Sequence, residues 1–137
     1  MSKLIKKTGL VGGGVIGGGW GVRLVLNGVD VKVFDPSDTA ERTLKEMLAN
    51  AELAYSKLTM APLVKQGKIE FVDSIEKAVK NVQFVQESVP ENPDFKRSII
   101  NEISQFAPES ALICSSTSGI KPTTLQTKMR HPERFMV

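Results

Sequence analysis

The sequence contains one cysteine and one histidine in 137 residues, and only 6% of its residues are aromatic. A single cysteine, Cys114, excludes an internal disulfide framework and is typical of a reducing compartment, so we predict a cytoplasmic location. No apolar run approaches the roughly 20 residues that a membrane-spanning helix requires. The basic N-terminal stretch also has no apolar segment long enough for a secretory signal. We therefore expect no membrane association, and we expect no metal site.

The balance of charge gives no sign of a polyanionic partner. The chain has 18 Lys and Arg residues against 15 Asp and Glu residues, so its net charge is +3, and the basic residues are scattered among acidic ones. No basic run is interleaved with aromatic residues, so we expect no nucleic-acid partner. A hydrophobic content of 41% with 24% charged residues is typical of a globular protein. The length suits one domain over residues 1–137.

Strands and helices are predicted to alternate along the whole chain. Short apolar runs predict strands at residues 8–12, 29–35, 69–72, 82–89 and 111–116, with another beginning at 134–137. Helical spacing and capping signals predict helices at 14–27, 38–58, 75–81, 94–106 and 121–129. Asn27-Gly28 is expected to end the first helix, and Asp38 with Glu41 to form a capping box for the second. This alternation predicts an α/β fold with a doubly wound parallel sheet, in which ligands bind at the carboxyl ends of the strands.

The densest glycine cluster lies between the first predicted strand and the first predicted helix. Gly12, Gly14 and Gly17 match the dinucleotide-binding pattern G-x-G-x-x-G. The first glycine permits a tight turn, the second lets a pyrophosphate approach the backbone, and the third lets helix and strand pack closely. Free N–H groups and the positive end of the helix dipole then bind the phosphates. The predicted cofactor-binding segment comprises Gly12, Gly13, Gly14, Val15, Ile16 and Gly17.

An acidic residue stands where this motif requires one. Asp35 lies 18 residues after Gly17, at the end of the second predicted strand, close to the expected distance of about 20. A carboxylate there accepts hydrogen bonds from the adenine ribose and repels a 2′-phosphate, so NAD is favoured over NADP. The alternative is that Asp35 is a turn residue before Pro36. Three further glycines in the helix either allow close packing or are merely tolerated: Gly18, Gly19 and Gly21.

Three segments together resemble the 3-hydroxyacyl-CoA dehydrogenase superfamily: GLVGGGVIGGGWGVRLVLNGVDVKVFDP, FVQESVPEN and SSTSGIKP. They occur in the family's order, and the branch they resemble most is that of the bacterial L-carnitine dehydrogenases. The resemblance implies an NAD-dependent oxidoreductase acting on a 3-hydroxy group, with an N-terminal Rossmann-type NAD-binding domain. It also implies a C-terminal helical domain that dimerises. We therefore expect a homo-oligomer with a small-molecule 3-hydroxy substrate.

The resemblance also assigns individual residues. The family's strand motif falls on residues 86–88, which include Glu87, and two residues near the cofactor fall on Glu91 and Lys96. The family's serine that hydrogen-bonds the substrate oxygen falls on Ser118, which is the expected catalytic residue. Serine alone cannot act as the base that removes the hydroxyl proton. Simpler roles stay open: a buried carboxylate for Glu87, a solvated helix lysine for Lys96 and a loop serine bonded to backbone for Ser118.

The family's catalytic histidine lies in a His-Pro-Phe-Asn-Pro motif and pairs with a later glutamate, and both would follow residue 137. His131 is also followed by proline, but it precedes the last predicted strand, so a surface-loop role is expected. The resemblance therefore implies a cofactor domain without the catalytic base and without the C-terminal helical domain. Cys114 is expected to pack within its strand.

Two classes of function fit the sequence. The first is the NAD-binding part of a dehydrogenase that oxidises L-carnitine to 3-dehydrocarnitine, with L-gulonate or a 3-hydroxyacyl-CoA as alternative substrates. The second is an NAD-binding module without catalysis. No residue of the chain indicates a site for a trimethylammonium group, so the choice of substrate depends on the resemblance alone.

Overall fold

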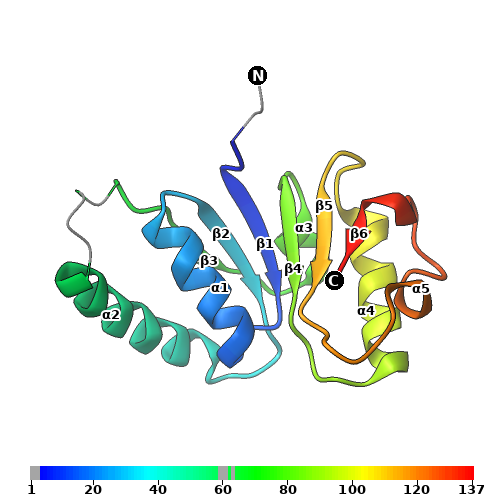
Figure 1. Cartoon of the computed structure of the whole chain (residues 1–137), viewed down its shortest axis with the longest axis horizontal. Helices are drawn as coiled ribbons and strands as arrows, with labels where there is room; N and C mark the ends of the chain where they lie inside the picture. The colour runs from blue at the N-terminus through cyan, green and yellow to red at the C-terminus, as the bar shows by residue number, and fades with distance from the viewer. Residues whose placement is uncertain (1–3, 59–61, 63) are drawn as a thin grey trace.

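The computed structural model describes residues 4–58, 62 and 64–137, which form a three-layered α/β domain (Figure 1). Within these residues, six parallel strands make one sheet in the order β3-β2-β1-β4-β5-β6. The strands are β1 (Lys7–Val11), β2 (Asp30–Phe34), β3 (Ile69–Phe71), β4 (Phe84–Glu87), β5 (Leu112–Ser115) and β6 (Phe135–Met136). The doubly wound parallel sheet predicted from the sequence is confirmed.

The connections between the described strands are helical. They are α1 (Val15–Leu26), α2 (Ala40–Leu58), α3 (Ile75–Val79), α4 (Pro93–Phe106), α5 (Pro122–Leu125) and the 3-10 turn η1 (Pro132–Arg134). In Figure 1, α1 and α2 lie on one face of the sheet, while α3 and α4 lie on the other. Neighbouring residues of a strand point to opposite faces. Accordingly, Leu10 packs in a cluster with residues of α1 and α2, whereas Val11 packs in a cluster with residues of α3 and α4.

The observed C-terminal end of α1 and N-terminal end of α2 can be compared with the capping signals predicted from the sequence. Gly28 follows α1 with a φ of +80°, the left-handed conformation that the predicted stop requires. The predicted cap of α2 is wrong by one residue, because the helix begins at Ala40 and its flanking residue is Thr39, not Asp38. The hydroxyl of Ser37 lies 3.0 Å from Thr39 Oγ1, and the Ser37 carbonyl accepts the Ala40 N–H at 3.3 Å. A turn that begins at Ser37 and ends at Ala40 therefore precedes α2 in place of the capping box.

The three glycines of α1 left open by the sequence divide into two kinds. A Cβ at Gly18 would lie 2.8 Å from Met47 Sδ of α2, and one at Gly21 would lie 2.8 Å from Leu10 Cδ1 of β1. Real Cβ atoms do not approach other atoms so closely, so a side chain at Gly18 or Gly21 would push aside the end of the Met47 or the Leu10 side chain. A Cβ at Gly19 would meet no atom within 4 Å, so packing gives no reason for that glycine.

One half of the sheet has an apolar face beside α1. Figure 1 shows the front of β4, β5 and β6 with no helix of the described chain across it. Trp20 of α1 borders this face and packs against Phe84 of β4, with ring centroids 6.2 Å apart. Leu112 and Met136, from β5 and β6, expose 39% and 47% of their surface and alternate with residues buried on the other face. Exposed apolar area of this kind is a candidate contact surface.

Two features are absent from the part of the chain that the structure describes. None of its helices combines the length and the hydropathy needed to cross a membrane. The same residues contain no group of three or more His, Cys, Asp or Glu side chains placed to hold a metal ion.

Candidate dinucleotide-binding site

The carboxyl end of β1 leads into the glycine-rich turn that opens α1. Gly12 has a φ of +97°, and a Cβ there would lie 2.7 Å from the carbonyl oxygen of Ser88. A Cβ at Gly17 would lie 1.8 Å from the Gly12 oxygen, so any side chain there would displace the backbone. A Cβ at Gly14 would meet nothing within 4 Å, so this glycine leaves open space at the start of the helix. The turn, the close packing and the open approach are the three properties that a pyrophosphate site requires.

The N-terminus of α1 is suited to an anion. Its flanking residue, Gly14, has no side chain to cap the helix, and the first turn contains no acidic residue. The first N–H groups of a helix have no carbonyl partners within it, and the helix dipole adds positive potential there. Phosphate groups are the usual ligands of such a terminus. Val15 and Ile16, the first helical residues, expose 79% and 60% of their surface beside it.

Asp35 closes this turn from the end of β2. Its Oδ2 accepts the Gly13 N–H at 2.6 Å, and its Oδ1 accepts the Ser37 N–H at 2.8 Å. The first bond fixes the carboxylate against the glycine turn, and the second is a turn bond of the kind that the alternative interpretation assumes. A carboxylate has about four lone-pair positions, so both oxygens keep acceptor capacity for ribose hydroxyls. The two interpretations of Asp35 are therefore compatible.

A cleft of 430 Å³ extends from the glycine turn past the ends of β2 and β4. Gly14 and Asp35 line its polar part, and Pro36, Val89 and Phe95 supply apolar walls. Its volume lies within the range of about 300–1,000 Å³ that is usual for ligand pockets. A helix N-terminus and a carboxylate beside apolar walls fit the chemistry of an adenine dinucleotide.

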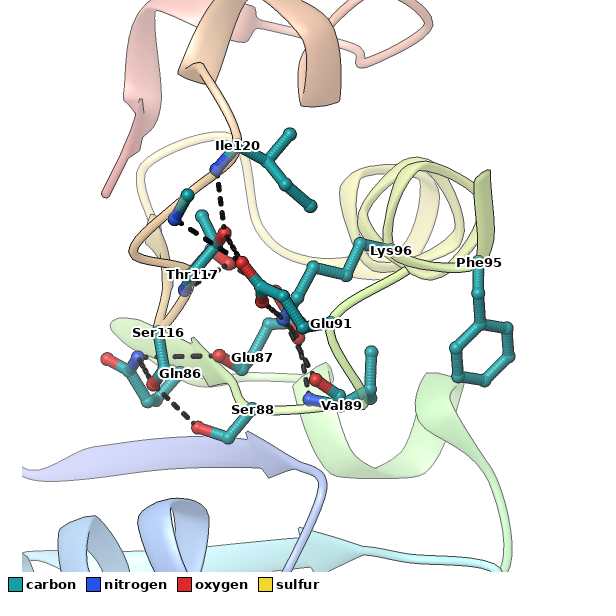
Figure 2. Close-up of polar contacts among 12 residues, drawn as sticks. Gln86, Glu87, Ser88, Val89, Glu91, Phe95, Lys96, Ser116, Thr117 and Ile120 are labelled. Carbon is teal, nitrogen blue, oxygen red and sulfur yellow. Dashed lines mark hydrogen bonds and ion pairs between the residues drawn. The ribbon is translucent and has the colours of Figure 1, made fainter. Parts of the chain in front are cut away.

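A buried ion pair lies next to this cleft, between the end of β4 and the start of α4. Lys96 Nζ lies 2.8 Å from Glu87 Oε1, and these side chains expose only 1% and 0% of their surface (Figure 2). The Lys96 ammonium also donates to the Val89 carbonyl at 2.9 Å. The same Glu87 oxygen accepts the Val89 N–H at 2.6 Å, and its other oxygen accepts the Ser115 hydroxyl. Glu87 is thus the buried network carboxylate of the simpler interpretation, whereas Lys96 is not a solvated helix lysine.

Glu91 joins this ion pair to the loop that follows β5. Its Oε2 lies 3.5 Å from Lys96 Nζ, and its Oε1 accepts the Thr117 hydroxyl and, at 3.4 Å, the Gly119 N–H. The hydrogen bond from Thr117, followed by that from Gly119 and the charge of Lys96, lowers the pKa of Glu91 against a weaker opposing effect of burial. The carboxylate is therefore ionised at neutral pH, and it is half exposed between the two loops.

Ser118, the expected catalytic residue, is exposed in the loop after β5. Its neighbours Thr117 and Gly119 are the residues that Glu91 holds. Because β4 and β5 are parallel, their carboxyl ends bring Ser118 and Glu91 to one edge of the sheet. The contact of Ser118 with a substrate stays a prediction.

Sequence reasoning misses a polar cluster on the other face of the same two strands. Gln86 Nε2 donates to Ser116 Oγ at 2.8 Å, and Ser116 Oγ lies 2.8 Å from Ser88 Oγ. Ser88 also packs against the glycine turn, because a Cβ at Gly17 would lie 3.3 Å from its Cβ. Strand alternation is the sequence pattern that could have indicated this cluster, because residues 86 and 88 point to the same face of the sheet.

The only histidine of the sequence, His131, lies away from this edge. It has a φ of +58° and comes just before η1 and β6, at the amino end of that strand. Its ring nitrogens lie 3.6 Å from Glu109 and 3.3 Å from Glu133, and its side chain is 40% exposed. This is the surface-loop position expected for it. Cys114 lies within β5, and burial raises the pKa of its thiol, which agrees with the expected packing role.

The chain matches the family model described as "3-hydroxyacyl-CoA dehydrogenase, NAD binding domain" over residues 7–137. The chain belongs to this family. The resemblance drawn from the three sequence motifs is therefore confirmed, and so is NAD as the cofactor of the domain.

Curated relatives of this chain include L-carnitine dehydrogenases from several bacteria. The L-carnitine dehydrogenase/betainyl-CoA thioesterase of Rhizobium meliloti (strain 1021) is 54% identical over 133 residues, which cover 97% of this chain and 27% of the relative. The L-carnitine dehydrogenase of Mesorhizobium japonicum is 47% identical over 135 residues, which cover 98% of this chain and 37% of the relative. The chain thus spans less than half the length of these relatives.

Solved structures share the fold over nearly the whole chain. An NAD⁺-dependent dismutase, 5-formyl-3-hydroxy-2-methylpyridine 4-carboxylic acid 5-dehydrogenase, superposes with a TM-score of 0.85 at 32% identity, covering 96% of this chain and 43% of that one. The (S)-3-hydroxybutyryl-CoA dehydrogenase of Ralstonia eutropha gives a TM-score of 0.80 at 27% identity, covering 96% and 48%.

Proposed function

We propose that this chain is the cofactor domain of an enzyme that oxidises L-carnitine to 3-dehydrocarnitine with NAD. The assignment of L-carnitine as the substrate rests on the 54% identity to an L-carnitine dehydrogenase/betainyl-CoA thioesterase across 97% of the chain. Further L-carnitine dehydrogenases are 47% and 42% identical. This set of relatives favours L-carnitine over L-gulonate and 3-hydroxyacyl-CoA substrates. The proposal extends to a cytoplasmic homo-oligomer.

The residues at the ends of β1 and β2 hold the adenine half and the phosphates in this proposal. N–H groups at the start of α1 bind the pyrophosphate, and Gly14 leaves room for it. Asp35 accepts the adenine ribose hydroxyls, and its bond to the Gly13 N–H at 2.6 Å orients the carboxylate before the cofactor binds. Such preorganisation reduces the entropy lost on binding. The same negative charge opposes the 2′-phosphate of NADP.

The nicotinamide half lies at the ends of β4 and β5, because a dinucleotide extends across the point where the strand order reverses, between β1 and β4. Bound NAD supplies the hydride acceptor. Ser118 orients the substrate oxygen by hydrogen bonding and does not remove its proton. By resemblance to the family, that proton is removed by a histidine that follows residue 137 and pairs with a glutamate.

The substrate is tested with the complete enzyme that contains this domain. Its kcat/KM is measured from NADH absorbance with L-carnitine, L-gulonate and 3-hydroxybutyryl-CoA. We expect the highest value with L-carnitine, and a higher value with either alternative would contradict the proposal. Ser118→Ala should lower kcat and leave NADH affinity unchanged, whereas an unaltered kcat would remove Ser118 from the reaction.

The role of Asp35 is tested with Asp35→Ala. We expect NADH binding to weaken by about 1.5–3 kcal/mol, the value of a hydrogen bond to a charged group, and the preference over NADPH to narrow. Asp38→Ala, an exposed aspartate three residues further on, is the matched control and should change neither affinity. A folded Asp35→Ala variant that binds NADH like the wild type would leave Asp35 as a turn residue only.

A further inference from the structure

Three polar side chains are joined by hydrogen bonds on the face of β4 and β5 opposite to α4. Gln86 Nε2 donates to Ser116 Oγ at 2.8 Å, and Ser116 Oγ lies 2.8 Å from Ser88 Oγ (Figure 2). We call Ser88 and Ser116 the serine pair. The same face of these strands otherwise carries apolar side chains such as Phe84 and Leu112. Gln86 exposes only 3% of its surface, so hydrogen bonds must replace the water that its amide loses.

Backbone hydrogen bonds fix both serines at the carboxyl edge of the sheet. The Ser88 N–H donates to the Val11 carbonyl of β1 at 2.8 Å, and the Ser116 N–H donates to the Glu87 carbonyl of β4 at 2.9 Å. Ser88 lines the cleft beside the glycine turn, where a Cβ at Gly12 would lie 2.7 Å from its carbonyl oxygen. The serine pair is therefore in place before a ligand binds, which reduces the entropy lost on binding.

The Gln86 amide sets the direction of the hydrogen bonds in this group. Its Nε2 lies 2.8 Å from Ser116 Oγ and 3.5 Å from the Glu87 carbonyl oxygen. A carbonyl oxygen can only accept, so the nitrogen of the amide and not its oxygen faces both groups. Ser116 Oγ therefore accepts a hydrogen bond from Gln86 and does not donate to it.

The serine pair has one hydroxyl hydrogen more than the contacts inside the protein use. Two hydroxyls carry two hydrogens, and the contact between Ser88 and Ser116 uses one of them. Among the residues that the structure describes, neither hydroxyl has a further acceptor. When Ser116 donates to Ser88, the second hydrogen belongs to Ser88, which lines the cleft. Each hydrogen bond in such a series polarises the next one, so Ser88 becomes a stronger donor towards the cleft.

We propose that the serine pair, through Ser88, donates a hydrogen bond to an uncharged oxygen of the nicotinamide half of NAD. The proposal rests on the cofactor placement proposed above. In that placement the pyrophosphate already has the N–H groups at the start of α1 as donors. Ser88 follows β4, on the nicotinamide side of the point where the strand order reverses. The nicotinamide half offers two kinds of uncharged acceptor, the ribose oxygens and the carboxamide oxygen.

Ser88→Ala removes the donor, and calorimetry with three ligands locates its acceptor. ADP ends at the second phosphate, ADP-ribose adds the second ribose, and NADH adds the nicotinamide ring. We expect NADH to bind about two- to tenfold more weakly, the range for one uncharged hydrogen bond, and ADP binding to stay unchanged. A matching loss with ADP-ribose identifies a ribose oxygen as the acceptor, and an unchanged ADP-ribose affinity identifies the carboxamide oxygen. Ser56→Ala, which removes an exposed hydroxyl of α2, is the matched control and should change no affinity.

Two results with Ser88→Ala would overturn the proposal. One is a folded variant with wild-type NADH affinity. The other is an equal loss of affinity for ADP, because Ser88 would then act on the glycine turn or the phosphates. Ser88→Cys decides the question if Ser88→Ala does not fold, since it keeps a similar side chain with only a weak S–H donor. We expect weaker NADH binding and unchanged ADP binding in that variant too, and unaltered NADH affinity would overturn the proposal.

Asp35→Ala separates this proposal from the cofactor placement on which it rests. That variant should weaken the binding of ADP as well as NADH, because Asp35 lies at the adenine end of the cleft. Unchanged ADP affinity in a folded Asp35→Ala variant would refute the placement and this proposal with it. If Asp35→Ala gives the expected loss and Ser88→Ala binds NADH like the wild type, only the role of the serine pair is refuted.

Discussion

Replacing Lys96 with methionine measures how much the buried ion pair contributes to stability. The substitution keeps most of the side-chain volume and removes the ammonium that lies 2.8 Å from Glu87 Oε1. Removing one partner of a buried pair typically costs about 3–5 kcal/mol, because the remaining charge stays desolvated. Glu87 keeps its hydrogen bonds from the Val89 N–H and the Ser115 hydroxyl, so we expect the lower end, about 3 kcal/mol. That is a large share of the roughly 5–15 kcal/mol by which a domain is stable.

Urea unfolding followed by far-ultraviolet circular dichroism tests this value. Lys45→Met is the matched control, because Lys45 makes a pair of similar length, 2.6 Å, with Glu41, but both side chains are more than half exposed. An exposed helix pair of this spacing contributes only about 0.3–0.5 kcal/mol. The double variant Glu87→Gln/Lys96→Met should regain most of the stability lost in Lys96→Met, because no charge is then buried without a partner. If Lys96→Met and Lys45→Met lowered the free energy of unfolding by equally small amounts, the reasoning would be refuted.

Three further predictions concern the loop, the chemistry and the surface. The pKa of Glu91 should lie below the ordinary glutamate value, so its hydrogen bonds to the loop persist until the pH falls through that lowered pKa. In an NMR titration, Thr117→Val should raise the pKa of Glu91, because it removes the hydroxyl that donates to the carboxylate. The 137-residue chain should form no NADH from L-carnitine and NAD, and turnover abolished by His131→Ala would contradict this. The chain should self-associate through the apolar face that contains Leu112 and Met136, and light scattering that shows equal mass for the wild type and Leu112→Lys would refute that.

The cofactor end of the fold was largely predictable from local sequence. The turn at Gly12 and Gly14 depends on residues close together in the chain, and so does the strand that leads into Asp35. The structure adds the reason why Gly17 cannot carry a side chain: a Cβ there would lie 1.8 Å from the Gly12 oxygen. The wrong cap of α2 has a local cause too: the motif at Asp38 competes with the turn at Ser37, and sequence alone does not rank them.

The network at the ends of β4 and β5 was not predictable in this way. Its key contact, from Ser115 to Glu87, joins residues 28 positions apart and depends on the register of two parallel strands. The burial of Lys96 depends on how α4 packs above that register. Resemblance to a family marks Glu91 and Lys96 as important, but it does not say which of them is exposed.

We propose that this domain binds NAD through the glycine turn and Asp35. Calorimetric titration of the chain with NADH and with NADPH tests it most directly. We expect NADH to bind at least about tenfold more tightly than NADPH, because one hydrogen bond to a charged group is worth about 1.5–3 kcal/mol and NADPH adds a repelling phosphate. Equal affinities, or tighter binding of NADPH, would contradict it.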